Sequence, residues 1–231
     1  MIKIGKRGWS IVDLQARLKW LNNDNTIVDG YFGEQSVMAV RNFQANYGLM
    51  VDGIVGPATY GALESLTAHA HLYLFIHCSA SKRSHKHVTG EWVKDYHMSR
   101  KRWSRPGYRD FIELDGTLTN LRPYNQNRLI ENEEYTWGVK GGILNKRASH
   151  ICYSGGLDEQ GEAEDTRTER QAETMEHYIK TALAFNPSLL IVGHNQVQKK
   201  ACPSFDVNQW GAQIGIPNHN LAHWKGNAKT Y

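Results

Sequence analysis

The chain has 231 residues, of which 40% are hydrophobic, and a formal net charge of +4. This hydrophobic content, with seven tryptophans and eleven tyrosines, argues against a disordered chain, and the length fits one large domain or a small domain joined to a medium one. The weak positive charge lacks the concentrated basic stripe of a nucleic-acid-binding protein, so we expect no nucleic acid partner.

The sequence also gives expectations about compartment and cysteine chemistry. The charged start of the chain is not followed by an apolar run of signal-peptide length, and nothing approaches the ~18 consecutive apolar residues of a membrane helix. We therefore expect a monomer that folds in the cytoplasm and does not insert into the membrane. Cys78, Cys152 and Cys202 are an odd number of cysteines, which argues against a disulfide framework and leaves at least one thiol for other chemistry.

An internal repeat occupies the N-terminal part of the chain. Residues 29–33 read DGYFG and residues 52–56 read DGIVG, and in each copy the Asp-Gly turn precedes a helical pattern. The second of these helices opens at Pro57, a residue suited to a first helical turn. Another helical pattern, over residues 11–21, comes before both copies. We therefore predict an all-α domain of three short helices over residues 1–66.

Residues 67–231 form the second predicted domain, which has mixed α/β character. No Pro- or Gly-rich spacer precedes it, so we expect the two domains to lie close together. Apolar runs predict buried strands, an Asp-Gly turn predicts a hairpin, and a capping box predicts a long helix. The predicted fold is a mixed central sheet flanked by helices. Its expected elements are strands at 72–76, 151–154 and 189–192, a hairpin over 108–121 and a helix from Thr168 to about Phe185.

Two of the predicted strands lead into a histidine. These histidines are His77 and His194, and Cys202 lies eight residues beyond His194. Two imidazoles and a thiolate are a suitable ligand set for zinc, and three protein ligands leave the fourth tetrahedral position for water. Spacing alone favours two structural histidines and a buried thiol over a metal site. We interpret the other nine of the eleven histidines as surface or scaffold residues.

A resemblance to a known family reverses that preference. From residue 77 to about residue 210 the chain is similar to the type-2 N-acetylmuramoyl-L-alanine amidases, especially the small phage enzymes. The similar segments are FIHCSA at 75–80, GY at 107–108, DGT at 115–117, ICYSGG at 151–156, GH at 193–194 and KACPSFD at 200–206. The resemblance implies one Zn²⁺ held by His77, His194 and Cys202, with Tyr108 and Lys200 as catalytic residues.

The same resemblance implies a reaction and its setting. The reaction is hydrolysis of the amide between N-acetylmuramic acid and L-alanine in bacterial peptidoglycan. The setting is that of a phage endolysin, which stays in the host cytoplasm until a separate protein permeabilises the membrane. Arg109 stands where the phage relatives carry histidine, a departure that bears on substrate contact. Residues 124–142 are too dissimilar for substrate contacts to be carried over.

Residues 5–65 independently resemble a peptidoglycan-binding module of three short helices. The features that carry this resemblance are the two DG turns together with Leu14-Gln15 and Phe43-Gln44. It implies that the first domain holds the enzyme on the cell wall and raises the local concentration of substrate. We therefore expect a chain that begins near Ala70 to fold and bind zinc, and the isolated first domain to bind sacculi without cutting them.

Two other functions stay open. Animal peptidoglycan recognition proteins share the amidase fold, and some of them only bind peptidoglycan. Those non-catalytic proteins lack the cysteine ligand, whereas this chain has Cys202. Regulation through an intracellular protein partner is the second alternative, and no feature of the sequence favours it.

Overall fold

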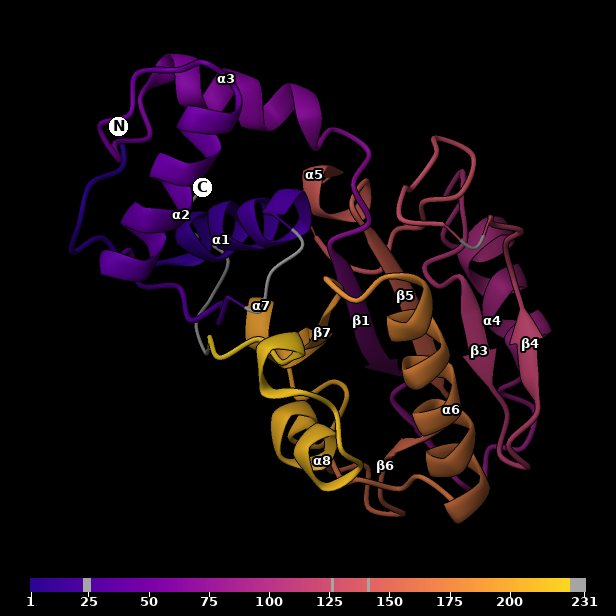
Figure 1. The fold of residues 1–231 in the computed structure, drawn as a ribbon. Helices are drawn as coiled ribbons and strands as arrows, with labels where there is room; N and C mark the ends of the chain where they lie inside the picture. The colour runs from indigo at the N-terminus through magenta and orange to yellow at the C-terminus, as the bar shows by residue number, and fades with distance from the viewer. Residues whose placement is uncertain (23–25, 126, 141, 225–231) are drawn as a thin grey trace.

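The computed structural model describes residues 1–22, 26–125, 127–140 and 142–224 (Figure 1). Its N-terminal part has the three predicted helices, α1 (Trp9–Asn22), α2 (Glu34–Asn46) and α3 (Pro57–Leu66). These helices enclose a small apolar core to which Leu14, Phe43 and Leu63 contribute one residue from each helix.

The internal repeat corresponds to a repeated hydrogen-bond motif. The Gln15 side chain donates to an Asp29 carboxylate oxygen at 2.9 Å and accepts from the backbone N–H of Gly30 at 2.9 Å. Gly30 has a φ of +70°, a conformation that glycine adopts without the strain of a Cβ. The buried glutamine therefore fixes the turn that leads into α2. Gln44, Asp52 and Gly53 make the same contacts in the turn before α3.

A five-stranded sheet forms the centre of the second part of the chain. Its strand order is β4-β3-β5-β1-β7, and all neighbours are parallel except the β3–β4 hairpin. This mixed sheet and its hairpin confirm the prediction. The strands are β1 (Tyr73–Cys78), β3 (Asp110–Ile112), β4 (Leu118–Asn120), β5 (Ala148–Tyr153) and β7 (Leu190–Gly193), and a separate parallel pair consists of β2 (Ser81–Lys82) and β6 (Gly156–Leu157).

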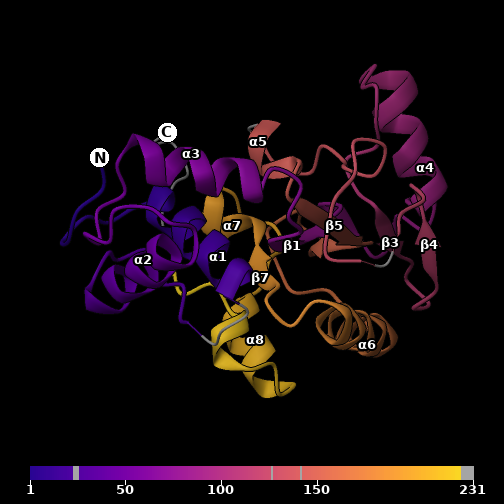
Figure 2. The same cartoon turned by 45° about the horizontal axis from the view of Figure 1, so that its top comes forward.

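Helices cover both faces of the sheet (Figure 2). On one face lies α6, which begins at the predicted capping box of Thr168 and Gln171. Helix α8 packs on the same face through Val207. The described residues contain no helix long and apolar enough to span a bilayer. The remaining bounds are α4 (Gly90–Asp95), the π-helical turn η1 (Tyr96–Arg100), α5 (Gly142–Asn145), α6 (Glu169–Phe185), α7 (His194–Val197), α8 (Val207–Gln213) and the 3-10 turn η2 (Asn218–Asn220).

Helix α1 belongs to two cores at once. Leu14 and Leu18 point into the core of the N-terminal helices. Trp9, Val12 and Ala16, on another side of the helix, lie in one apolar cluster with residues of β1, β5 and β7. Because this second side is buried against the sheet, the N-terminal helices are packed on the second domain and not merely tethered to it. This packing argues against unchanged folding of a chain that begins near Ala70.

Buried cations add polar contacts to the same junction. Arg17 of α1 pairs with Glu64 of α3 at 2.9 Å, and Glu64 in turn pairs with Arg147, next to β5, at 2.6 Å. The Lys19 ammonium, which is completely buried, donates to the backbone carbonyl of His219 at 2.9 Å. A buried charge needs a partner of defined geometry, so these contacts fix how the C-terminal segment and the N-terminal helices sit against each other.

Candidate active site

The alternation of side chains along β1 determines where His77 points. Phe75 packs on the α1 face of the sheet, whereas Ile76 and Cys78 belong to the cluster under α6. His77 alternates with Ile76 and Cys78, and therefore faces the same side as Phe75. It is completely buried at the carboxyl end of the strand. The neighbouring strand β7 runs directly into α7, whose first residue is His194.

The three predicted metal ligands lie together. The Nδ1 atoms of His77 and His194 are 3.0 Å apart, and the Sγ atom of Cys202 is 3.8 Å from the Nδ1 atom of His77. All three ligand atoms lie within 4.8 Å of one another, and no other such group occurs in the described ranges. Cys202 reaches this position from the loop after α7, where its sulfur accepts from the backbone N–H of Cys78 at 3.3 Å. Their role as metal ligands stays a prediction.

The two histidines are neutral, whereas the Cys202 thiol keeps its proton unless a cation lies beside it. Burial lowers the pKa of His77 well below its usual value, and burial lowers the pKa of His194 to about 4. Both imidazoles are therefore neutral near pH 7 and have a free lone pair. The pKa of Cys202 is raised well above its usual value by the neighbouring Cys78 thiol and by burial. A thiolate at this position thus needs a positive charge beside it, which a metal ion provides.

The two predicted catalytic residues flank the cluster. Tyr108 is half-buried, and its ring centre is 5.0 Å from that of His77. Burial raises the pKa of Tyr108 well above its usual value, so the phenol keeps its proton and can donate a hydrogen bond. Lys200 is exposed, and its positive charge contributes to lowering the pKa values of both His77 and His194. A hydroxyl donor and an ammonium group thus flank the same site.

Sequence analysis missed a third histidine at this site. His150 lies on β5 and is completely buried, and its Nδ1 atom is 3.0 Å from the Nε2 atom of His77. It was interpreted as one of the scaffold histidines. The available signal was its place directly before the strand predicted over 151–154; in the structure that strand begins at Ala148 and pairs with β1.

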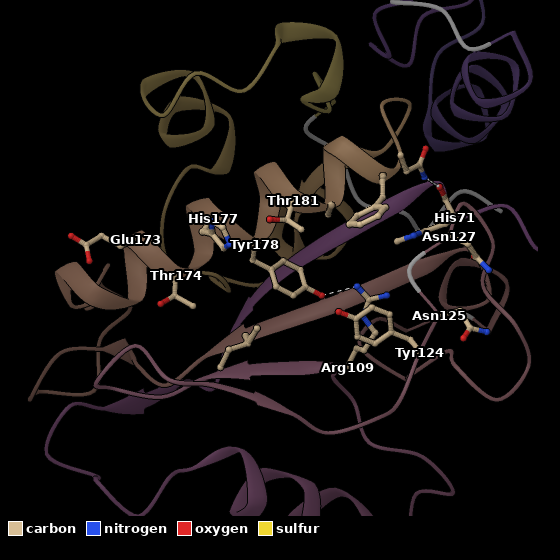
Figure 3. Close-up of a pocket in the computed structure, with 14 residues that line it drawn as sticks. His71, Arg109, Tyr124, Asn125, Asn127, Glu173, Thr174, His177, Tyr178 and Thr181 are labelled. Carbon is tan, nitrogen blue, oxygen red and sulfur yellow. Dashed lines mark hydrogen bonds between the residues drawn. The ribbon is translucent and has the colours of Figure 1, made fainter.

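The Arg109 side chain points away from the ligand cluster, although its backbone N–H donates to the carbonyl of His150 at 2.8 Å. Its side chain turns to the α6 face of the sheet, where it donates to the Tyr178 hydroxyl at 2.6 Å and stacks on Tyr124 (Figure 3). It lines a cavity of about 510 Å³ there, together with Phe185 and Asn186. The arginine that stands in place of histidine after Tyr108 therefore has its side chain on the α6 face of the sheet, away from the ligand cluster.

Comparisons with known proteins agree with this architecture. Residues 7–63 match the family model described as a putative peptidoglycan binding domain. The endolysin of Escherichia phage T7 is 29% identical over 137 residues, which are 59% of this chain and 83% of the relative. The spore cortex-lytic enzyme of Halalkalibacterium halodurans is 43% identical over 67 residues, which are 29% of this chain and 20% of the relative.

Solved structures give a similar picture at lower identity. The N-acetylmuramoyl-L-alanine amidase LysC from Clostridium intestinale has a TM-score of 0.48 at 19% identity, covering 62% of this chain and 85% of that one. The Ph2119 endolysin from a Thermus scotoductus bacteriophage also has a TM-score of 0.48 at 19% identity, covering 64% and 86%. The comparisons thus support the resemblance predicted from the sequence: the N-terminal part matches a peptidoglycan-binding family model, and the chain is similar to phage endolysins over 137 residues.

Proposed function

We propose that this chain is a zinc-dependent N-acetylmuramoyl-L-alanine amidase that cuts the amide between N-acetylmuramic acid and L-alanine in peptidoglycan and so lyses bacterial cells. The observation that carries the proposal is the group formed by two buried histidines and one partly buried cysteine, His77, His194 and Cys202, whose ligand atoms lie within 4.8 Å of one another. The endolysin relatives support the more general activity of peptidoglycan hydrolysis.

The residues of this group fit zinc. Two neutral imidazole nitrogens and one sulfur are a typical donor set for a catalytic zinc ion, with room for one further ligand. The two Nδ1 atoms face each other across 3.0 Å, close enough for both to be ligands of one ion. When bound, zinc would supply Lewis-acid chemistry, polarising a carbonyl group and lowering the pKa of water.

The flanking residues provide the remaining chemistry. The Lys200 ammonium supplies positive charge where the carbonyl oxygen of the scissile amide gains negative charge, and such a donor strengthens as that charge develops. The protonated Tyr108 hydroxyl orients the attacking water or the same carbonyl through a hydrogen bond. His77 and His194 stay neutral, and therefore keep their lone pairs directed at one point.

We assign the two parts of the chain different tasks. Residues 1–66 hold the protein on the cell wall, and residues 67–231 cut it. The match of residues 7–63 to the peptidoglycan-binding family supports the first task. Holding an enzyme on a polymer raises the effective concentration of the bonds that it cuts. The packing of α1 on the sheet means that the first part also stabilises the second.

Metal analysis and product analysis of the full chain test the proposal. We expect one zinc per chain, loss of activity on sacculi after chelation, and recovery with added zinc. The products should carry new L-alanine amino termini and no new reducing sugar ends. Cys202→Ala should lose most of the zinc, whereas Cys152→Ala, which removes a buried thiol outside the cluster, should retain it. Full zinc retention in Cys202→Ala would refute the ligand assignment.

The binding-only alternative predicts a different result in the same assay. A non-catalytic recognition protein would sediment with sacculi and release no amino termini, whatever its metal content. The Cys202 thiol beside two histidines favours the enzyme, because it completes a three-ligand set.

A further inference from the structure

His77 has different partners at its two ring nitrogens. Its Nδ1 atom faces His194 and Cys202, and its Nε2 atom faces the Nδ1 atom of His150 at 3.0 Å. The two nitrogens point to different sides of the ring, so His150 lies on the side of His77 away from the ligand cluster. His150 is therefore not a fourth ligand, and because it is completely buried it is not a substrate contact either.

The use of Nδ1 as a ligand would fix which nitrogen of His77 carries the hydrogen. A ligand nitrogen must present a lone pair, so a neutral His77 that uses Nδ1 as a ligand has its hydrogen on Nε2. That N–H can then donate only to the Nδ1 atom of His150. The second histidine of the cluster shows the same pattern, since the Nε2 atom of His194 lies 2.9 Å from the side-chain oxygen of Gln198. Each ligand histidine thus has a protein acceptor behind it.

The surroundings of His150 hold its ring in this orientation. The ring stacks on Phe75, with centres 5.3 Å apart and planes 10° from parallel. Behind it lies Gly138, where a Cβ atom would come within 2.1 Å of the Nδ1 atom of His150. Only a glycine leaves room for the ring at this position. Gly138 lies within residues 124–142, for which the family resemblance gave no substrate contacts.

The Nε2 atom of His150 makes no comparable contact. Among the described residues its Nε2 atom is buried without a hydrogen-bond partner. A buried polar atom without a partner costs free energy, which makes histidine a poor choice for a residue that only fills space. The contact with His77 is therefore the polar interaction that distinguishes histidine from an aromatic hydrocarbon here.

We propose that His150 is a positioning residue that accepts a hydrogen bond from the Nε2 atom of His77 and thereby keeps the Nδ1 lone pair of His77 directed at the ligand cluster. The inference rests on the proposed zinc site and adds a residue to it. Partners behind metal-bound histidines strengthen metal binding by about 10- to 100-fold, and we expect an effect of this size.

Zinc affinity of the full chain, measured by competition with a chromophoric chelator, tests the proposal. His150→Phe keeps a ring that can stack on Phe75 but has no acceptor, and it should bind zinc about 10- to 100-fold more weakly. His150→Asn restores an acceptor oxygen near the Nδ1 position and should recover much of the loss. Circular dichroism checks the fold of both variants. Zinc affinity of His150→Phe within about threefold of wild type would overturn the proposal.

A second measurement needs no variant. Nitrogen-15 NMR of the metal-free wild-type chain should show the His77 hydrogen on Nε2, and a hydrogen on Nδ1 would overturn the proposal even if His150→Phe failed to fold. Gly138→Ala, which pushes the His150 ring away, should weaken zinc binding as His150→Phe does. If wild type itself binds no zinc, the proposed function fails; if wild type and His150→Phe bind equally well, only the role of His150 fails.

Discussion

Replacing Trp9 by alanine tests whether the N-terminal helices are part of the core beneath the active site. Trp9 is completely buried between α1 and the sheet, and its ring centre lies 5.8 Å from that of Tyr73 at the start of β1. The same strand carries His77 at its other end. Within the described residues the indole N–H of Trp9 has no hydrogen-bond partner, so the substitution removes packing and no hydrogen bond.

The expected cost follows from the burial of the side chain. Truncating a buried tryptophan to alanine typically costs ~3–5 kcal/mol of unfolding free energy. The substitution also removes a buried N–H that has no partner, which offsets about 1 kcal/mol or more of this loss. We therefore expect the unfolding free energy to fall by about 3 kcal/mol. A domain of ordinary stability has about 5–15 kcal/mol in total, so the variant should stay folded but unfold at clearly lower urea concentration.

Urea unfolding of the full chain should be combined with hydrogen exchange of the β1 amides. In Trp9→Ala both the unfolding midpoint and the protection of residues 73–78 should fall. Met38→Ala is the control, because Met38 lies on α2 and is 63% exposed; its effect should be within about 0.5 kcal/mol. If Trp9→Ala loosened only the N-terminal helices and left β1 protection at the wild-type level, the argument for a shared core would be refuted.

Three further predictions concern other parts of the molecule. Lys200→Ala should keep zinc and fold but lose ~10²–10³ in turnover on sacculi, with a milder loss in Tyr108→Phe; wild-type rates in both would remove them from the mechanism. Burial and the nearby Arg109 charge lower the pKa of His71 to about 3, so as the pH falls His71 is protonated in the unfolded chain before it is protonated in the folded one. Stability should therefore drop by up to ~1.4 kcal/mol per pH unit from pH 6.5 towards 3, and less steeply in His71→Gln; equal slopes would contradict this assignment. Gln44→Ala leaves the Gly53 N–H without its acceptor and should cost about 1–3 kcal/mol in urea unfolding, whereas a loss below ~0.5 kcal/mol would show that the turn holds without it.

Local rules in the sequence predicted much of the fold. The apolar run before His77 predicted a buried strand, and the capping box at Thr168 located the start of α6. The repeated DG turns predicted helices α2 and α3. In each case the signal lies within a few residues, where backbone preference and side-chain period act directly. The short helices α7 and α8 carry weaker local signals and were not predicted.

Features that depend on distant contacts could not be obtained in the same way. The leucine pattern of α1 identified one buried side, but Trp9, Val12 and Ala16 are buried by a sheet that begins more than fifty residues later. Arg17 and Lys19 have the sequence character of a solvated helix surface, yet both are buried because acceptors from other segments surround them. Periodicity cannot reveal such partners.

The same limit applies to the active site. Spacing did not distinguish His77, His194 and Cys202 from structural residues, and it was the family resemblance that selected them. Nothing in the resemblance pointed to His150, because its role depends on strand pairing. In the sheet, Phe75 of β1 is paired with His150 of β5, and this register brings the imidazole next to His77. The role of a histidine in a central strand therefore depends more on the residues beside it on the neighbouring strand than on the residues next to it in the sequence.

The packing of α1 also changes what the N-terminal module can do for the enzyme. A tether on a flexible linker raises the local substrate concentration but leaves the direction of approach open. Here α1 packs on β1 and β7, the strands that lead to His77 and His194, and the buried Lys19 contacts the C-terminal segment. A wall polymer bound to the module would therefore meet the ligand cluster in one orientation. We therefore expect the module to contribute orientation as well as proximity, and substitutions at the α1–sheet contact to impair cutting of intact wall more than binding to it.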